Sequence, residues 1–263
     1  MELGISGRVA LVTGGSKGIG RAVAAGLAKE GCRIAIVARG VEALREAADD
    51  LGAKGAEVLT VAADLAEPDS PPRVLEAVVA RFGRLEILVN NAGAIRGGDF
   101  LSTPAEQWAD DWRLKVLGYV RMAQAAIPVM RPGRWGRIVN IIGAAARNPA
   151  TTYMAGGIAN AGLINFTRAL ADLAAPDGIL VNAVSPGATA TERWDRLVSQ
   201  QAQAQGQPAE ALRADVARKQ PLGRIGRPED VADLVVFLAS ERAGFLTGAS
   251  ITVDGGASRG VYL

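Results

Sequence analysis

The sequence contains no histidine, and Cys32 is its single cysteine among 263 residues. Histidine is the commonest general base near neutral pH and the commonest metal ligand, so its absence excludes a Ser-His-Asp hydrolase and a histidine-liganded zinc site. One cysteine excludes an internal disulfide and gives no support for secretion. Acid–base chemistry must therefore come from Tyr, Lys, Asp, Glu or Ser, and no metal site is predicted.

Long hydrophobic runs and a large excess of one charge are also missing. No stretch approaches the roughly 20 apolar residues of a membrane span, and the first residues do not have the pattern of a secretory signal. The 29 basic and 27 acidic residues give a formal net charge of +2, which is weak support for binding to nucleic acid or to a membrane surface. We expect neither partner, and we expect a cytoplasmic location.

Short β-branched runs alternate along the chain with longer helical patterns. Strands are expected at 8–14, 33–39, 57–64, 84–93, 136–143, 179–187 and 249–256, and helices at 19–31, 40–55, 69–83, 104–131, 152–175 and 228–240. The strands are nearly continuous apolar runs, typical of a parallel sheet covered on both faces. The pattern predicts one Rossmann-like, doubly wound α/β domain over 1–263, with a seven-stranded, mostly parallel sheet and helices on both faces.

Two segments depart from a simple alternation of strands and helices. Pro128 lies inside the expected helix at 104–131 and is expected to end or kink it. The Gln- and Ala-rich stretch at 199–220 is too long for an ordinary connection between a strand and a helix. We interpret 188–220 as a helical lid over a substrate site, with a plain linker as the alternative.

The segment TGGSKGIG (13–20) joins the first expected strand to the first expected helix. Gly14 permits a tight turn, whereas Gly18 and Gly20 let the backbone approach a phosphate and let the helix pack closely on the strand. The helix N-terminus presents free N–H groups and a partial positive charge to an anion. Because the glycines lie between a strand and a helix, they predict a dinucleotide site rather than a plain turn.

Four motifs occur in order along the chain: the TGxxxGIG turn, NNAG (90–93), SPG with a later threonine (185–191), and GRIGRPEDVADLVVFLAS with GFLTGASITVDGG (223–256). Through them the chain resembles the short-chain dehydrogenase/reductase family nearly from end to end. The resemblance implies hydride transfer between a nicotinamide and a carbonyl or alcohol carbon. It also implies a homodimer or homotetramer, because catalytic helices and last strands often pair in that family.

The resemblance also implies roles for particular residues. Asn90 and Gly93 would steady the central sheet beside the cofactor, and Asp64 would lie beside the adenine, with a helix N-cap as its alternative role. Pro186, Gly187 and Thr191 would line the nicotinamide pocket. The residues expected to bind the cofactor are Gly14, Ser16, Lys17, Gly18, Ile19, Gly20, Arg39, Asp64, Leu65, Asn91, Ala92, Gly93, Pro186, Gly187, Thr189 and Thr191.

The second expected strand ends in Ala38 and Arg39 rather than in a carboxylate. An Asp or Glu at this point would bind the ribose 2′-hydroxyl of NAD, whereas Arg39 can pair with the 2′-phosphate of NADP. Lys17 in the glycine turn adds a second positive charge, although both cations could instead be solvated surface residues. We therefore expect NADP(H) to be preferred over NAD(H).

The resemblance implies four catalytic groups, namely a Tyr, a Lys four residues later, a Ser and an Asn. Aligned backward from FTRALA (166–171), the Tyr position is Gly156 and the Lys position is Asn160. The Ser position is Gly143 and the Asn position is Lys115. None of the four has the usual side chain, so we expect a divergent member with a rearranged site.

Tyr153 lies three residues before Gly156, which is about 4.5 Å along a helix and on nearly the same face. Glycine at 156 would leave room for the phenol to lean into the expected tyrosine site. Relative to the family pattern, the lysine and the asparagine have exchanged helices: Lys115 stands at the Asn position and Asn160 at the Lys position. If Lys115 lies close to Tyr153, its charge would favour the phenolate form of the tyrosine. We assign the catalytic roles to Tyr153, Lys115 and Asn160.

Each catalytic assignment has a structural alternative. Tyr153 could cover the first turn of its helix, Lys115 could extend to solvent, and Asn160 could bond to the backbone. Because Gly143 has no side chain, polarisation of the carbonyl must come from elsewhere, either from an N–H group or from a hydroxyl of Thr151 or Thr152. Tyr119, one turn after Lys115, is a reserve proton donor whose alternative is core packing.

The leading hypothesis is an NADP(H)-dependent oxidoreductase acting on a small-molecule carbonyl or secondary alcohol. The alternative is a catalytically silent NADP(H)-binding protein, either a cofactor sensor or a non-catalytic partner subunit, because fold alone does not establish function. A lyase or isomerase using Lys115 as acid–base is a third option. The substrate pocket is expected from residues 94–100, 143–153 and 188–220.

Overall fold

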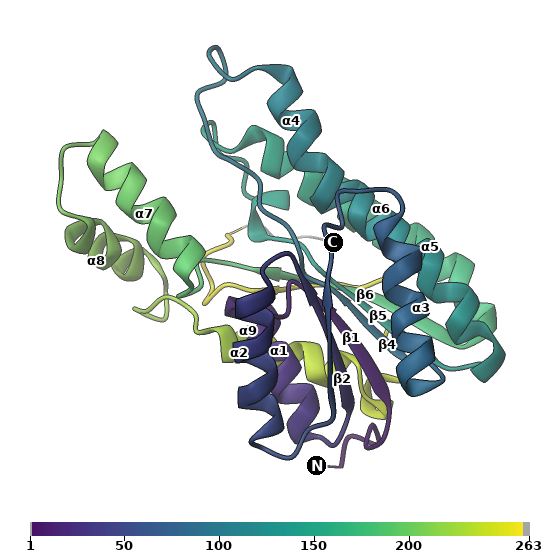
Figure 1. Cartoon of the computed structure of the whole chain (residues 1–263). Helices are drawn as coiled ribbons and strands as arrows, with labels where there is room; N and C mark the ends of the chain where they lie inside the picture. The colour runs from purple at the N-terminus through teal and green to yellow at the C-terminus, as the bar shows by residue number, and fades with distance from the viewer. Residues whose placement is uncertain (1, 260–263) are drawn as a thin grey trace.

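Seven parallel strands form one sheet in the order β3-β2-β1-β4-β5-β6-β7 (Figure 1). The computed structural model describes residues 2–259. The strands are β1 (Val9–Thr13), β2 (Arg33–Ala38), β3 (Val58–Ala62), β4 (Ile87–Asn90), β5 (Gly136–Ile141), β6 (Ile179–Pro186) and β7 (Ser250–Val253). The predicted Rossmann-like fold is confirmed, and every pairing of these strands is parallel rather than most of them.

Helices cover both faces of the sheet, as the apolar strands require. The α-helices of the described residues are α1 (Gly18–Lys29), α2 (Val41–Gly52), α3 (Ser70–Phe82), α4 (Ala105–Trp112), α5 (Gly118–Met130), α6 (Met154–Ala174), α7 (Glu192–Ala204), α8 (Ala209–Lys219) and α9 (Pro228–Leu238). Successive residues of β1 face opposite ways: Ala10 and Val12 pack with α1, α2 and α9, whereas Val9 and Leu11 pack with α3, α5 and α6. Two apolar layers therefore hold the strand ends in place, and with them the loops that build the site.

The helix expected over 104–131 is divided by one wide turn. A π-helical segment at Arg113–Leu117 separates α4 from α5, and Lys115 lies at its centre. Such π segments often occur at functional sites because they re-aim a side chain within an otherwise regular helix. Pro128 lies inside α5, which ends two residues later at Met130.

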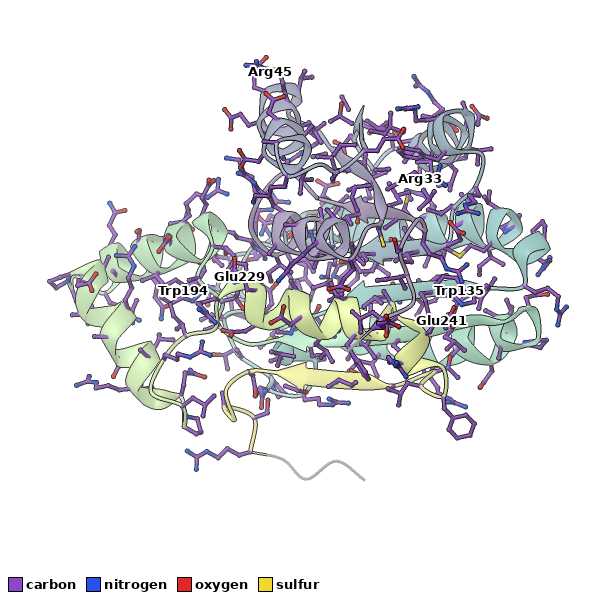
Figure 2. All side chains as sticks on the ribbon, turned by 90° about the horizontal axis from the view of Figure 1, so that it is seen from below. Arg33, Arg45, Trp135, Trp194, Glu229 and Glu241 are labelled. Atoms are coloured by element: carbon purple, nitrogen blue, oxygen red, sulfur yellow. The ribbon has the colours of Figure 1, made fainter. Side chains whose placement is uncertain are left out.

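The segment expected to form a lid contains α7 and α8, which extend away from the sheet (Figure 1). The two helices share a small apolar core of their own, centred on Val198, Ala202 and Leu212. Figure 2 shows the pair from another side, with Trp194 near its base. Coverage of a substrate by these helices remains a prediction.

No helix in residues 2–259 is long and apolar enough to cross a membrane.

Candidate active site

The glycine turn between β1 and α1 is shaped for close approach of another group. Gly14 and Gly18 have φ values of +65° and +53°, which L side chains rarely adopt. A Cβ on Gly20 would lie within 3.0 Å of the Gly14 carbonyl oxygen and the Asn91 amide. No side chain caps the first turn of α1, whose N-cap residue is Lys17, so its N–H groups remain available to an anion.

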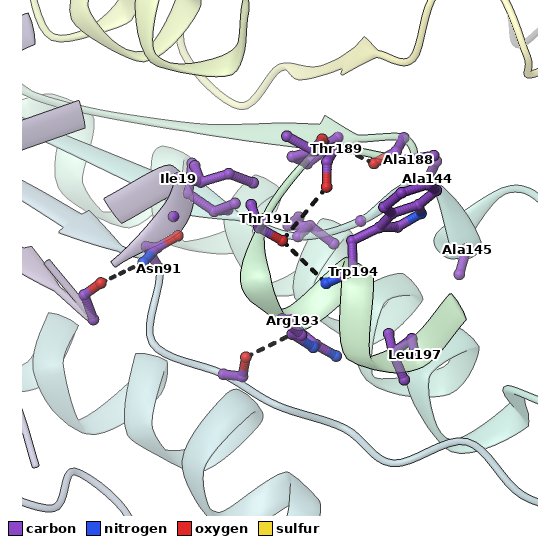
Figure 3. Close-up of a pocket in the computed structure, with 18 of the residues that line it drawn as sticks. Ile19, Asn91, Ala144, Ala145, Ala188, Thr189, Thr191, Arg193, Trp194 and Leu197 are labelled. Atoms are coloured by element: carbon purple, nitrogen blue, oxygen red, sulfur yellow. Dashed lines mark hydrogen bonds between the residues drawn. The ribbon is translucent and has the colours of Figure 1, made fainter. Parts of the chain in front are cut away.

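Thr13 and Asn91 join the ends of β1 and β4 beneath this turn. The Asn91 side chain donates to the backbone oxygens of Thr13 and Gly14 at 2.9 and 3.2 Å. The Thr13 hydroxyl accepts from the backbone N–H groups of Asn91 and Ala92 at 2.8 and 2.9 Å. Figure 3 shows Asn91 in this arrangement. These bonds fix the glycine turn against the loop that follows β4.

Polar side chains also connect the centre of the sheet with α6. Asn90 donates to the Asn140 side-chain oxygen at 3.0 Å, and Asn140 donates to the Thr167 hydroxyl at 2.9 Å. All three side chains are buried, so the bonds replace those lost to water. Asn90 thus steadies the central strands, in the way expected of it.

A cavity of about 530 Å³ extends from the glycine turn to the starts of α6 and α7. All three predicted catalytic residues line it. The predicted cofactor residues that line it are Gly14, Lys17, Gly18, Ile19, Asn91, Ala92, Gly93, Pro186, Gly187, Thr189 and Thr191. The others, Ser16, Gly20, Arg39, Asp64 and Leu65, lie outside its lining.

Arg39 and Asp64 lie beside each other on the surface. The Arg39 guanidinium is 3.8 Å from the Asp64 carboxylate, and the Arg39 side chain is 74% exposed. The other Asp64 oxygen accepts from the backbone N–H of Ala66 at 3.0 Å, which closes a turn well before α3 begins at Ser70. Asp64 therefore stabilises a loop turn rather than capping a helix, and it stands next to the cation expected to bind the 2′-phosphate.

Lys115 is buried and its amino group has three protein acceptors. Its Nζ donates to the backbone oxygens of Ile141 and Ile142 at 2.7 and 3.1 Å and to the Tyr119 hydroxyl at 3.3 Å. The side chain passes over Gly93, where a Cβ would collide with it. Burial, and secondarily the nearby Arg193 guanidinium, lowers the pKa of Lys115 from 10.5 to about 7. The solvent-directed alternative for Lys115 is therefore wrong.

Three reserve assignments do not hold in the structure. Tyr119 is only 1% exposed and its hydroxyl donates to the Ile141 carbonyl at 2.9 Å, so it belongs to the core. Burial raises the pKa of Tyr119, which makes it a poorer acid. Thr151 and Thr152 do not line this cavity and instead line a smaller pocket that Tyr153 shares.

Tyr153 lies directly over Gly156. The residue immediately precedes α6, and a Cβ built on Gly156 would lie within 3.0 Å of three atoms of the Tyr153 ring. Real Cβ atoms essentially never make contacts this close, so the ring occupies space that any other side chain at 156 would need. The expected leaning of Tyr153 toward the site of residue 156 is thus present in the structure, and it depends on glycine there.

Gly156→Ala is expected to displace the Tyr153 ring from the cavity. We expect at least a tenfold lower kcat with little change in cofactor affinity, because the substitution is remote from the glycine turn. Gly162→Ala in the same helix is the matched control, since a Cβ there meets nothing within 4 Å. Alanine should stabilise α6 by up to about 1 kcal/mol at 162 and give less or no gain at 156, as measured by urea denaturation. Equal kinetics for the two variants would contradict the dependence on Gly156.

Asn160 lies beside Gly143, the residue expected at the serine position of the family. A Cβ on Gly143 would be 3.0 Å from Asn160 Nδ2, so the amide covers the place where a serine side chain would start. Asn160 is 3% exposed, and its Oδ1 has no hydrogen-bond partner among the described residues. A buried polar atom without a partner is costly, which indicates that a bound molecule or water completes its bonding.

Arg193 was missed by the sequence reasoning. It comes from the first turn of α7, and its guanidinium donates to the backbone oxygens of Gly93 and Ile95 at 3.1 and 3.2 Å (Figure 3). It also donates to the Tyr153 hydroxyl at 3.4 Å. Arg193, rather than Lys115, is therefore the cation at the phenol. The sequence signal that could have identified Arg193 is its position in the segment TERW, two residues after Thr191, which was predicted to line the nicotinamide pocket.

Comparisons with known proteins agree with this geometry. A family model described as enoyl-(acyl carrier protein) reductase matches residues 14–258. The chain is 35% identical to the 3-oxoacyl-[acyl-carrier-protein] reductase FabG of Escherichia coli (strain K12) over 257 residues, covering 97% of this chain and 98% of that protein. The chain belongs to the short-chain dehydrogenase/reductase family.

Solved structures of this family are close to the chain throughout. The L-sorbose reductase of Gluconobacter frateurii, complexed with NADPH and L-sorbose, is 38% identical, with a TM-score of 0.94 over 99% of this chain and 100% of that one. YwfH, an NADPH-dependent reductase involved in bacilysin biosynthesis, is 29% identical, with a TM-score of 0.92 over 97% and 100%. The fold of these reductases therefore spans nearly the whole of this chain.

Proposed function

We propose that the chain is an NADP(H)-dependent oxidoreductase that transfers a hydride between nicotinamide and a small carbonyl compound or secondary alcohol. The observation that carries this proposal is the single cavity that joins the phosphate-type glycine turn to Tyr153, Lys115 and Asn160. A binding site without chemistry would not require a phenol, an amine and an unpartnered amide at the far end of the same cavity.

The residues present fit a dinucleotide. Gly14 and Gly18 line the cavity with bare backbone, and the start of α1, whose N-cap residue Lys17 makes no side-chain capping bond, offers N–H groups to a pyrophosphate. Lys17 adds positive charge at this end, although its ammonium pairs with Glu192 of α7 at 2.9 Å. Among the described residues no cluster of His, Cys, Asp or Glu could hold a metal, so carbonyl polarisation falls to organic groups.

Within the site, the chain's own residues handle the proton. A bound nicotinamide would supply the hydride for the carbonyl carbon. Tyr153 donates its hydroxyl proton to the carbonyl oxygen, which becomes the alcohol. Arg193, 3.4 Å from that hydroxyl, stabilises the phenolate that remains. Lys115 and Asn160 line the same end, where the Asn160 amide can bond to the ribose or substrate.

The names of the relatives support reduction without naming the substrate. The family model is described by enoyl reduction, whereas FabG is described by reduction of a 3-oxoacyl group, and a structural neighbour acts on L-sorbose. Enoyl, oxoacyl and sugar groups differ in size and charge. The similarity to these proteins therefore supports hydride transfer, and the substrate has to be inferred from the residues that line the cavity.

The decisive test is oxidation of NADPH by the purified protein across a broad panel of carbonyl compounds. Turnover of any of them, lost in Tyr153→Phe, would support the proposal and eliminate the catalytically silent alternative. NADPH binding with no turnover across the panel, in either direction of the reaction, would favour the silent binding protein. Conversion of a substrate without a change in cofactor redox state would instead favour a lyase or isomerase.

Preference for NADP(H) is expected to depend on Arg39. Removing the guanidinium in Arg39→Ala takes away the cation available to the 2′-phosphate, so the Kd for NADPH should rise by about tenfold while the Kd for NADH hardly changes. Calorimetric titration with each cofactor measures both constants. Arg45→Ala on α2 is the matched control, because Arg45 is exposed and pairs with Glu42. Tighter binding of NADH than of NADPH by the natural protein would refute the preference.

A further inference from the structure

The deep end of the cavity holds two basic side chains without a matching carboxylate. Lys115 and Arg193 both line it, and every protein acceptor they reach is neutral, being a backbone carbonyl or a tyrosine hydroxyl. Neither forms an ion pair with a carboxylate in the part of the chain that the structure describes. A partly desolvated guanidinium is best stabilised by an anion, because neutral acceptors leave its charge uncompensated.

The acidic residues nearest to Arg193 in sequence form ion pairs with other basic residues. Glu192 pairs with Lys17 at 2.9 Å, and Asp195 pairs with Arg213 of α8 at 3.1 Å. Both pairs hold α7 in place, one to the glycine turn and the other to α8. With α7 held in this way, Arg193 is directed at the loop after β4 and at Tyr153.

The geometry points to a substrate that carries a carboxylate close to its reacting carbonyl group, and Arg193 is the residue that binds this carboxylate. This inference rests on the proposed function, which it deepens by naming the substrate class. A guanidinium presents paired N–H donors that match the two oxygens of a carboxylate. The 3.4 Å bond to the Tyr153 hydroxyl is long, so it leaves the guanidinium able to bind a charged oxygen beside the phenol.

The position of Tyr153 limits the distance between the two substrate groups. Because Arg193 and the Tyr153 hydroxyl are in hydrogen-bond contact, a carboxylate on the guanidinium places an adjacent carbonyl oxygen near the phenol. A 2-oxo or 3-oxo acid has this spacing, and its reduction gives a hydroxy acid. The cavity lining also includes Ala144, Ala145, Trp194 and Leu197, which suits an apolar or aromatic remainder (Figure 3).

The test measures binding to the complex with oxidised cofactor, NADP+, in which a carbonyl compound cannot be reduced. Pyruvate, 2-oxobutyrate, acetoacetate and benzoylformate are titrated calorimetrically beside their methyl esters, which keep the carbonyl and lose the charge. We expect at least one acid to bind tenfold or more tightly than its ester. In Arg193→Met its affinity should fall by roughly tenfold to a hundredfold, while the ester changes less than threefold.

Controls separate this inference from the proposed function and from loss of folding. Arg218→Met removes an exposed cation of α8 that pairs with Asp215, and it should leave the acid affinity unchanged. NADP+ affinity in each variant reports whether the fold and cofactor site persist. Failure of the natural protein to bind NADP+ would defeat the proposed function itself.

With NADP+ bound, three results would overturn the carboxylate assignment alone. They are equal affinity for every acid and its ester, undetectable binding of all four acids, or unchanged acid affinity in Arg193→Met. Benzyl phosphate is titrated as well, as an anion that is not a carboxylate. If Arg193 is needed for benzyl phosphate and no carboxylate binds, the deep site accepts an anion of a different class, and the assignment is again overturned.

Discussion

Replacement of Tyr153 by phenylalanine is expected to lower kcat by about 10²- to 10⁴-fold, the range typical for loss of a general acid. The ring keeps its place over Gly156, so only the hydroxyl that faces Arg193 is lost. NADPH affinity should stay near that of the natural protein, because the glycine turn is untouched. Steady-state kinetics with a substrate found in the carbonyl panel, together with calorimetric titration of NADPH, would measure both quantities.

Tyr119→Phe is the matched control for this prediction. It makes the same chemical change in the core, where the hydroxyl bonds to Ile141 and Lys115. We expect a loss of about 1 to 3 kcal/mol in the free energy of unfolding and a much smaller effect on kcat. If Tyr119→Phe abolished turnover and Tyr153→Phe did not, the proton donor would have to be reassigned to the core tyrosine.

The fold could be predicted from the sequence because its signals are local. Each strand is an apolar run such as RVALVTG, and a helical pattern lies between each run and the next, so the alternation is visible without knowledge of any long-range contact. The glycine turn is equally local, because Gly14, Gly18 and Gly20 serve a turn that spans eight residues. Parallel pairing of all seven strands then follows from right-handed crossovers through the helices.

The active-site geometry could be predicted only in part because it depends on contacts between distant segments. The position of Tyr153 over Gly156 was accessible, since both residues belong to one helical turn. The two backbone acceptors of Lys115 lie 26 and 27 residues away, on β5 and just after it. The π-helical segment that buries this side chain has no clear sequence signature. Arg193 reaches Tyr153 from 40 residues away, so its partner could not be inferred from spacing.

The burial of Lys115 has a consequence for stability that can be measured without any substrate. Its pKa falls from 10.5 in an exposed chain to about 7 in the folded protein, mainly because burial disfavours the charged form. Between these two values the unfolded chain holds the proton and the folded protein does not. Stability therefore rises with pH across this window, by up to about 1.4 kcal/mol per pH unit from this residue.

Lys115→Met should remove that contribution. The free energy of unfolding of the natural protein minus that of the variant is expected to grow by about 2 kcal/mol from pH 7 to pH 9, because other titrating groups cancel in the difference. Below pH 7 the difference should level off, since both states of the natural protein are then protonated at Lys115. Urea denaturation at a series of pH values measures this difference in the free energy of unfolding. Lys219→Met, at an exposed position of α8, is the control, and its difference should not change with pH.

The same measurement tests whether the amine of Lys115 is neutral in the folded protein. A buried amine whose pKa stayed at its usual value would give a difference that is the same at every pH, whatever hydrogen bonds it donates to Ile141 and Ile142. A difference that grows with pH shows instead that the buried amine releases its proton near neutrality, as a group that exchanges protons during turnover must. Because Arg193 is the second cause of the lowered pKa, Arg193→Met should shift the onset of this growth to higher pH. A flat difference for Lys115→Met would contradict the lowered pKa and leave Lys115 as a hydrogen-bond donor in the wall of the cavity.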